Sequence, residues 1–222
     1  MTGDQVTAKQ APQLMLASAS PRRAELLRQL RLRFRQCSMD IDETPGAGEP
    51  ARELVVRLAR DKALAGRDRV PLSAGLPVLA ADTLVSVEGC ILGKPVDRAD
   101  GLQMLARLSG QEHEVLTAIA VAGPEGVSTC LSVSRVWFRT LEPGEAERYW
   151  ASGEPRDKAG GYGIQGLGGI FVTRLDGSYT GVMGLPLAET ELLLRQAGVD
   201  CWAYREGPSA AMTVEAGQER SE

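Results

Sequence analysis

Two long apolar segments joined by a short turn constrain the fold of this chain more than any other feature. Residues 114–122 and 128–140 are predicted as strands, and Gly123-Pro124-Glu125-Gly126 lies between them. This connection is too short for a crossover, so it predicts an antiparallel hairpin. Strands alternate with helical spacing earlier in the chain, which is typical of parallel pairing, so the whole sheet is predicted to be mixed. The other predicted strands are 13–18, 34–42, 77–87 and 169–175.

Five segments with helical spacing accompany the strands, and together they predict an α/β fold. At roughly 150 residues per domain, a chain of 222 residues forms one domain or two. Small, polar and aperiodic residues at both ends predict flexible tails at 1–12 and 205–222, with a single domain at 13–204 between them. The predicted helices are 21–30, 51–66, 97–108, 143–152 and 186–196.

Composition and charge exclude several classes of protein. With 43% hydrophobic and 24% charged residues, the chain resembles an ordinary globular protein. A net charge of −4 argues against a nucleic-acid-binding protein. No apolar run reaches the ~18 residues of a membrane span, and residues 1–12 are too polar for a signal peptide, so no membrane association and a cytoplasmic location are expected. The four cysteines lie far apart without a C-x-x-C pair, which argues against a zinc site or a disulfide framework.

A pair of arginines at a predicted helix start indicates an anion site. Ser20 is predicted as the N-cap and Pro21 as the first helical residue, so Arg22 and Arg23 fall in the first turn. Cations there are unfavourable beside the positive end of the helix dipole, unless a bound phosphate reverses the sign. The alternative is two solvated arginines on an exposed turn.

An aspartate inside an apolar strand is the second candidate. Asp82, within Leu79-Ala80-Ala81-Asp82-Thr83-Leu84-Val85, is a poor strand residue and suits a general base or a metal ligand; a capping or turn role is the alternative. Acidic residues at the end of the predicted strand 34–42 could join it, because alternation places Asp40 and Asp42 on one face and Glu43 on the other. Taken alone, that cluster is more typical of a solvated edge, and Lys62 is equally ambiguous.

A glycine-dense segment, 153–169, is the third candidate. Gly161 to Gly166 spells G-x-G-x-x-G, but a charged loop precedes it and a strand follows, which rejects a dinucleotide-binding site. Its backbone could approach a ligand closely, and the amide of Gln165 complements the N3–H and O4 edge of uracil or thymine. A flexible turn without a ligand is the alternative. The only histidine, His113, is interpreted as a surface or hydrogen-bonded residue rather than a catalytic one.

At these positions the sequence resembles the Maf family of nucleoside triphosphate pyrophosphatases. The resemblance covers about 13–201 and includes several ordered motifs. It implies a Maf/ITPase-like α/β fold, with an elongated mixed sheet, flanking helices and two lobes around a central nucleotide-binding cleft. It also implies a divalent cation, Mg or Mn, and a homodimer. The motifs are Ser18-Ala19-Ser20-Pro21-Arg22-Arg23, Ala81-Asp82-Thr83, Gly93-Lys94-Pro95, Leu108-Ser109-Gly110, and Gly153-Glu154-Pro155 through Gly166.

The resemblance also implies roles for particular residues. Asp82 corresponds to the catalytic proton acceptor, and Asp82 with Glu43 would hold the metal. Because of the residues around Gln165, the chain is similar to the branch acting on dTTP and UTP, which are converted to the monophosphate and pyrophosphate. The alternatives are a pyrophosphatase for 7-methyl-GTP or other modified nucleotides, and a non-catalytic nucleotide-binding regulator of septation. Implied substrate contacts are Ser18, Arg22, Arg23, Glu43, Lys62 and Lys94, and implied specificity residues are Arg22, Thr83 and Gln165.

Overall fold

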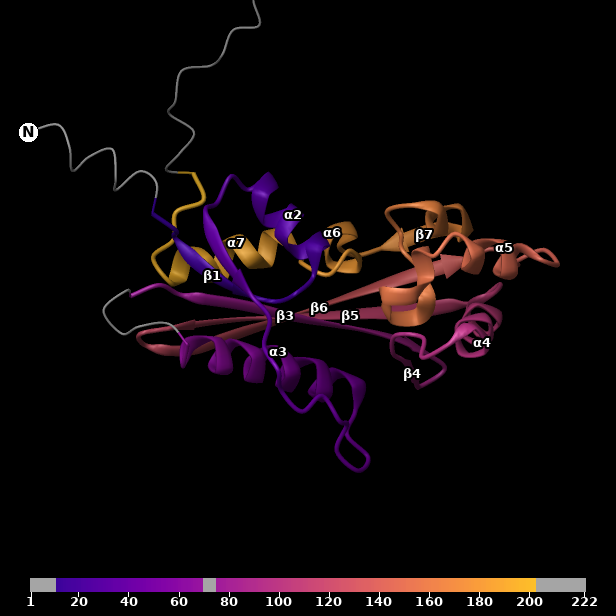
Figure 1. Cartoon of the computed structure of the whole chain (residues 1–222), viewed down its shortest axis with the longest axis horizontal. Coiled ribbons are helices and arrows are strands. Elements are labelled where there is room, and N and C mark those ends of the chain that lie inside the picture. The colour runs from indigo at the N-terminus through magenta and orange to yellow at the C-terminus, as the bar shows by residue number, and fades with distance from the viewer. Residues whose placement is uncertain (1–10, 70–74, 203–222) are drawn as a thin grey trace, which may run out of the picture.

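A computed structural model describes residues 11–69 and 75–202, which form an elongated mixed sheet flanked by helices (Figure 1). Almost all of the predicted tails, 1–12 and 205–222, lie outside these residues. The sheet has seven strands in the order β2-β1-β3-β5-β6-β7, with β4 paired to β3. The strands are β1 (Leu14–Ala17), β2 (Phe34–Cys37), β3 (Val78–Val87), β4 (Cys90–Leu92), β5 (Glu112–Gly123), β6 (Gly126–Phe138) and β7 (Val172–Asp176).

The predicted hairpin is confirmed. β5 and β6 pair antiparallel along their whole length, from Glu112 opposite Trp137 to Gly123 opposite Gly126. β1 is parallel to both β2 and β3, while β3 is antiparallel to β5. The mixed sheet therefore arises as expected, with two helical crossovers before the hairpin. The helices of the described chain are α2 (Pro21–Gln29), α3 (Ala51–Arg67), α4 (Arg98–Leu108), α5 (Glu145–Ala151), α6 (Tyr179–Val182) and α7 (Leu187–Gln196).

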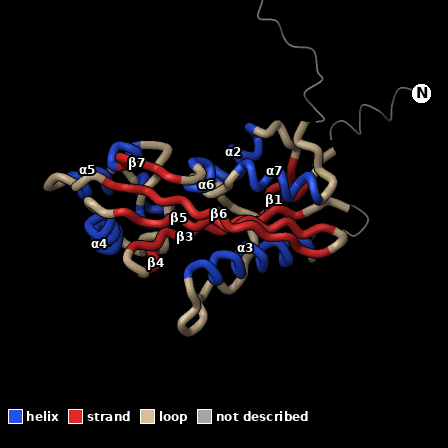
Figure 2. The backbone as a smooth tube through the Cα atoms, turned by 180° about the vertical axis from the view of Figure 1, so that it is seen from behind, coloured by secondary structure: helices blue, strands red, loops and turns tan. Residues whose placement is uncertain are grey.

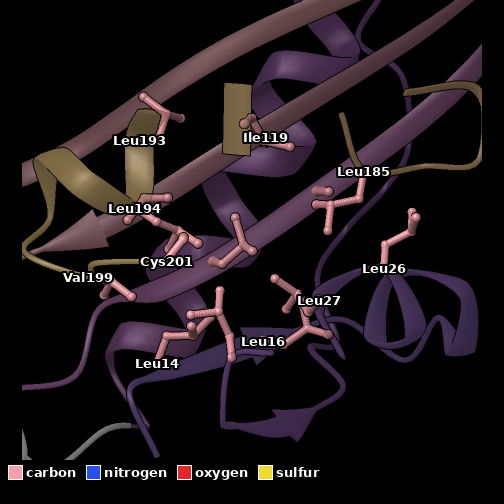
Figure 3. Packing of buried hydrophobic residues seen from close by; sticks show 14 of the residues in the cluster. Leu14, Leu16, Leu26, Leu27, Ile119, Leu185, Leu193, Leu194, Val199 and Cys201 are labelled. Atoms are coloured by element: carbon pink, nitrogen blue, oxygen red, sulfur yellow. The ribbon is translucent and has the colours of Figure 1, made fainter. Parts of the chain in front are cut away.

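Alternation along β3 separates two layers of core. Leu79 and Ala81 face a cluster shared with α2 and α7, which includes Leu27 and Leu194 (Figure 3). Val78 and Ala80 point to the opposite face and pack on α3. Figure 2 shows the same arrangement from behind, with α3 alone on its side of this part of the sheet. Consecutive residues of β3 therefore reach different layers of the molecule.

A third cluster fills the far end of the sheet, around α4 and α5. Leu105 and Leu108 of α4 pack there with Phe138, Tyr149 and Phe171. The strands β3, β5 and β6 extend from the first pair of clusters into this one (Figure 1). Two lobes with separate cores are thus joined by continuous strands, as the resemblance implies.

The structure differs from the predicted elements at the edges. The predicted strand 34–42 ends at Cys37, because its partner β1 offers only four residues for pairing. The predicted strand 169–175 begins in a 3₁₀ segment and becomes β7 only at Val172. β4, α6 and the 3₁₀ segments η2 (Glu154–Asp157), η3 (Ala159–Gly161) and η4 (Leu167–Phe171) were not predicted. No helix among residues 11–69 and 75–202 is long and apolar enough to cross a bilayer.

Candidate active site

A cleft of about 790 Å³ lies between the two lobes, which is within the size range of small-molecule sites. It is lined by the start of α2, by β3, and by parts of the segments 38–45, 157–165 and 182–184. All the residues to which the resemblance assigns a role line it. They are Ser18, Arg22, Arg23, Glu43, Lys62, Asp82, Thr83, Lys94 and Gln165.

Asp82 and Lys62 form the centre of the cleft on the α3 side of the sheet. Asp82 continues the alternation of Val78 and Ala80, so its side chain points toward α3, where the Lys62 ammonium donates to Oδ1 at 2.6 Å. The side chains of Asp82 and Lys62 are only 10% and 12% exposed. A carboxylate in an apolar strand is tolerated here because a cation compensates for its burial. Lys62 is therefore not the solvated helical lysine that its sequence position alone would allow.

Glu43 contributes a second carboxylate to the same ammonium, with its Oε1 2.7 Å from Lys62 Nζ. Burial alone would raise the pKa of Glu43, but the hydrogen bond and charge of Lys62, with the charges of Lys94 and Arg23, outweigh it. The net pKa is below the ordinary value of 4.5, so Glu43 is a carboxylate at neutral pH. Lys94 is exposed at the cleft and close enough to influence that pKa.

The predicted arrangement of the other acidic residues was wrong. Residues 38–46 leave the sheet as a loop, so strand alternation does not apply to them. Asp40 is exposed and does not line the cleft, while Asp42 accepts the backbone N–H of Thr44 at 2.9 Å. The loop that carries Glu43 is anchored differently, because Arg57 of α3 donates to Glu49 at 2.7 and 2.8 Å and to the Thr44 carbonyl at 3.0 Å.

Thr83 lies on the opposite side of the sheet from Asp82, where it meets Arg23. The Arg23 guanidinium donates to Thr83 Oγ1 at 3.0 Å, to Ser18 Oγ at 3.2 Å and to the Gly184 carbonyl at 2.8 Å. Burial lowers the pKa of Arg23 below the ordinary value of arginine, and the charge of Asp82 partly opposes this effect. With three protein acceptors already bound, Arg23 fixes the wall of the cleft.

Arg22 is differently placed, although it is the next residue. The predicted N-cap is confirmed, since Ser20 Oγ accepts the N–H of Arg23 at 3.4 Å and Pro21 opens α2. The Arg22 side chain, 29% exposed, pairs across the cleft with Asp157 at 3.2 Å. An exposed pair of this kind is weak, so an incoming phosphate can compete with Asp157 for the guanidinium. Asp157, which the sequence analysis did not select, is a cleft residue, and its position in the 153–166 motif was the available signal.

The glycine-dense segment forms short 3₁₀ turns around Gln165. The side chain of Gln165 is exposed to the cleft, and no hydrogen-bond partner for it occurs among residues 11–69 and 75–202. The flexible-turn alternative does not fit, because Gly160 donates its N–H to the Gly93 carbonyl at 2.9 Å and Gly163 donates to the Tyr149 hydroxyl at 3.0 Å. The turn therefore presents a free amide from a fixed backbone.

His113 is buried, so the surface interpretation is wrong and the hydrogen-bonded one is confirmed. His113 is 2% exposed and lies 2.8 Å, through Nε2, from the Tyr162 hydroxyl, in edge contact with Phe138. Burial lowers its pKa to about 4. The four cysteines, Cys37, Cys90, Cys130 and Cys201, are all unpaired with one another. No group of three metal-ligating His, Cys, Asp or Glu side chains occurs in the described ranges.

An interlobe cleft with cations on several sides, a buried carboxylate and a free amide defines an α/β protein with a site for a small polyanionic ligand. The comparisons with known proteins make this specific: a Maf-like protein family model matches residues 13–197. The chain belongs to the Maf family.

Three similar proteins are named dTTP/UTP pyrophosphatase. The dTTP/UTP pyrophosphatase of Photobacterium profundum is 51% identical over 189 residues, which cover 83% of this chain and 96% of that protein. The dTTP/UTP pyrophosphatase of Hahella chejuensis is 50% identical over 190 residues, covering 86% and 94%. The protein of that name from Bordetella parapertussis is 52% identical over 205 residues, covering 88% and 98%.

Proposed function

We propose that this protein hydrolyses dTTP and UTP to the nucleoside monophosphate and pyrophosphate. The observation that carries the proposal is the buried Asp82–Lys62 pair in a cleft that also collects Arg22, Lys94 and Gln165. The names of the similar proteins support the choice of substrates. They do not favour 7-methyl-GTP or a purely regulatory role.

The triphosphate is bound by cations that come from separate elements. Arg22 exchanges its exposed pairing with Asp157 for phosphate oxygens, and Lys94 adds a charge from the segment after β4. Ser18 and Arg23 lie between these residues and the strand, with the Ser18 hydroxyl already fixed by the guanidinium. Such preorganised donors stabilise charge that develops on the phosphates during the reaction.

Asp82 is proposed as the proton acceptor for the attacking water. The water oxygen bonds to the α-phosphorus, the bond to the bridging oxygen breaks, and pyrophosphate leaves with the electron pair. The proton of the water passes to the Asp82 carboxylate. Lys62 holds Asp82 and Glu43 at 2.6 and 2.7 Å, so the carboxylate has one fixed orientation.

The donor set fits a divalent cation of the Mg²⁺ kind. Such an ion is commonly held by one or two carboxylates together with substrate phosphates, and Glu43 and Asp82 supply two carboxylates at one side of the cleft. When bound, the ion would neutralise charge on the phosphate oxygens. Glu43 and Asp82 are the residues that would hold it.

Gln165 is proposed to select the pyrimidine. With its NH2 toward O4 and its oxygen toward N3–H, the amide matches uracil or thymine, and in that orientation it does not match cytosine, which has a donor at N4 and an acceptor at N3. Because the Gln165 side chain has no hydrogen-bond partner elsewhere in the described chain, pairing with the base breaks no hydrogen bond within the protein. A homodimer and a cytoplasmic location, which the resemblance and the sequence predict, belong to the same proposal.

The proposal is tested by Asp82→Asn, which keeps the shape of the side chain and removes the base. We expect kcat for UTP to fall about 10²- to 10⁴-fold, the usual contribution of general base catalysis, with little change in KM. Pyrophosphate release is the measurement. Asp40→Asn, which alters an exposed carboxylate outside the cleft, is the matched control and should retain wild-type turnover.

A panel of nucleoside triphosphates completes the test. The wild-type protein should release pyrophosphate fastest from dTTP and UTP, and Gln165→Ala should reduce that preference. Near-wild-type turnover in Asp82→Asn would refute the catalytic assignment, while an unchanged substrate profile in Gln165→Ala would refute the specificity assignment.

A further inference from the structure

Tyr149 and Glu154 form a hydrogen-bonded pair beside the cleft that the proposed chemistry does not use. Tyr149, in α5, is 5% exposed and packs edge-on against Phe171 with ring centroids 5.1 Å apart. Its hydroxyl donates to Glu154 Oε1 at 2.7 Å. Burying the hydroxyl and partly burying the carboxylate costs desolvation, so the other contacts of the pair should show what it holds in place.

The pair binds the backbone of the glycine-dense segment on both sides of Gln165. Before Gln165, the N–H of Gly163 donates to the Tyr149 hydroxyl at 3.0 Å. After it, the N–H of Leu167 donates to Glu154 Oε2 at 2.9 Å and that of Gly168 to Oε1 at 3.0 Å. Three residues, 164–166, therefore lie between an anchor at Gly163 and one at Leu167, and both anchors lead to the Glu154 carboxylate.

The spacing of the glycines follows from these contacts. A Cβ at Gly166 would lie 2.5 Å from Glu154 Oε2, and one at Gly168 would lie 2.5 Å from the Tyr149 hydroxyl. A Cβ at Gly163 would lie 2.8 Å from Lys158 Cε. Side chains at these positions would displace the pair, so the glycines provide room for Tyr149 and Glu154. This role is additional to the sequence-based prediction that the glycines allow a ligand to approach, and Gly163 also lines the cleft.

The start of the segment is held by other contacts. Gly160 donates to the Gly93 carbonyl at 2.9 Å, and Tyr162 is hydrogen-bonded to His113 at 2.8 Å. Loss of the Tyr149–Glu154 pair would therefore release the turn around Gln165 without detaching η3 from the lobe. The effect should be local to the base-recognition end of the cleft.

We infer that Tyr149 and Glu154 are positioning residues for pyrimidine selection, because they hold the backbone on both sides of Gln165 and so set where its amide meets the base. The inference rests on the proposed function, in which Gln165 reads the base edge. Neither residue needs to touch the substrate. The pair acts through the turn that it holds.

The experiment compares Tyr149→Phe and Glu154→Gln with the wild-type protein, with UTP and CTP as substrates. Tyr149→Phe keeps the ring against Phe171 and removes both hydrogen bonds of the hydroxyl. We expect the ratio of kcat/KM for UTP to that for CTP to fall about ten- to a hundredfold, the size of effect of misplacing one group by about 1 Å. Glu147→Gln, an exposed charge change on the same helix, should leave the ratio unchanged.

A double-variant cycle separates positioning from a general structural role. In the Gln165→Ala background, Tyr149→Phe and Glu154→Gln should produce no further fall in the ratio, because the group they position is absent. An equal fall for both substrates, or the same fall in the Gln165→Ala background, would overturn the inference.

Amide hydrogen exchange gives a measurement that does not depend on turnover. The N–H groups of Gly163, Leu167 and Gly168 should exchange faster in both variants, while that of Gly160 should not. Unchanged exchange at all three overturns the inference. If the wild-type protein prefers neither dTTP nor UTP, the proposed function fails. In that case the role of Tyr149 and Glu154 is decided independently, by the exchange data and by the effect of the two variants on the nucleotide preference that the wild-type protein does show.

Discussion

Arg22 and Arg23 are adjacent in α2, yet the structure predicts opposite consequences of replacing them with methionine. Arg23 donates three hydrogen bonds to protein acceptors on three different segments, whereas Arg22 makes one ion pair with an Asp157 side chain that is 62% exposed. Methionine keeps most of the length and apolar stem of arginine in both cases. The two variants therefore compare a guanidinium that holds the cleft together with one that is available to a ligand.

The loss of unfolding free energy in each variant follows from the number of acceptors that the substitution leaves without a donor. Each of the three Arg23 hydrogen bonds is worth about 1 kcal/mol after discounting for partial exposure, so Arg23→Met should lower the free energy of unfolding by about 3 kcal/mol. At roughly 2–4 °C per kcal/mol for a chain of this size, Tm falls by about 10 °C. The exposed Arg22–Asp157 pair is worth at most about 1 kcal/mol, so Arg22→Met shifts Tm by no more than about 4 °C.

Thermal and urea unfolding of both variants, followed by circular dichroism, measure these differences. For substrate binding, measured as KM in a pyrophosphate-release assay, the larger effect should come from Arg22→Met. This variant should raise KM for UTP about tenfold, because a charge-assisted hydrogen bond to phosphate is lost. Equal Tm shifts, or a larger shift for Arg22→Met, would refute the division of roles. So would an unchanged KM in Arg22→Met.

Three further predictions concern proton binding, metal binding and backbone shape. Burial lowers the pKa of His113 from 6.5 to about 4, so the unfolded chain binds the proton more tightly than the folded protein does. About 3 kcal/mol of stability that is present above pH 6.5 should therefore be lost as the pH falls to 4. Urea titrations at pH 7 and pH 5 should show much of this loss in the wild type and little of it in His113→Gln. Removal of divalent ions with EDTA should abolish turnover, yet Mg²⁺ alone should raise Tm by less than about 1 °C, because a site of two carboxylates needs the substrate phosphates to complete it; a large Tm rise without nucleotide would contradict this. Gly177→Ala should lower the free energy of unfolding by about 2–4 kcal/mol, because the φ of Gly177 is +127° and a Cβ there would lie 2.9 Å from Ser134 Cα. Gly48→Ala should lower it by only about 1 kcal/mol in the same assay, because Gly48 has φ +71° but a Cβ there would have nothing within 4 Å.

The fold was predictable because its signals are local. Apolar runs, the short turn before Gly126 and the cap at Ser20 each act within a few residues, and all three were confirmed. The end of β2 was not predictable in the same way, because the strand stops at Cys37 where β1 offers no further partner. The length of an edge strand is set by its neighbour in space.

The site was predictable in its residue types but only partly in its contacts. Alternation along β3 sends Asp82 toward α3 and Thr83 toward α2, which period-two reasoning alone could have found. The role of the glycines could not be found in that way. Glu154 lies 13 and 14 residues from Leu167 and Gly168, and only the folded chain brings its carboxylate against their backbone.

The strands shared by the two lobes limit how the cleft can change shape. β5 and β6 pair without interruption from Glu112 to Gly123, and β3 pairs with β5 over nine consecutive residues, so a hinge between the lobes would have to break these ladders. Hinge closure of two flexibly connected domains is therefore ruled out as the way in which substrate is admitted. The sheet is rigid across the cleft, so a change in the shape of the cleft must come from segments outside the sheet, chiefly the loop that carries Glu43.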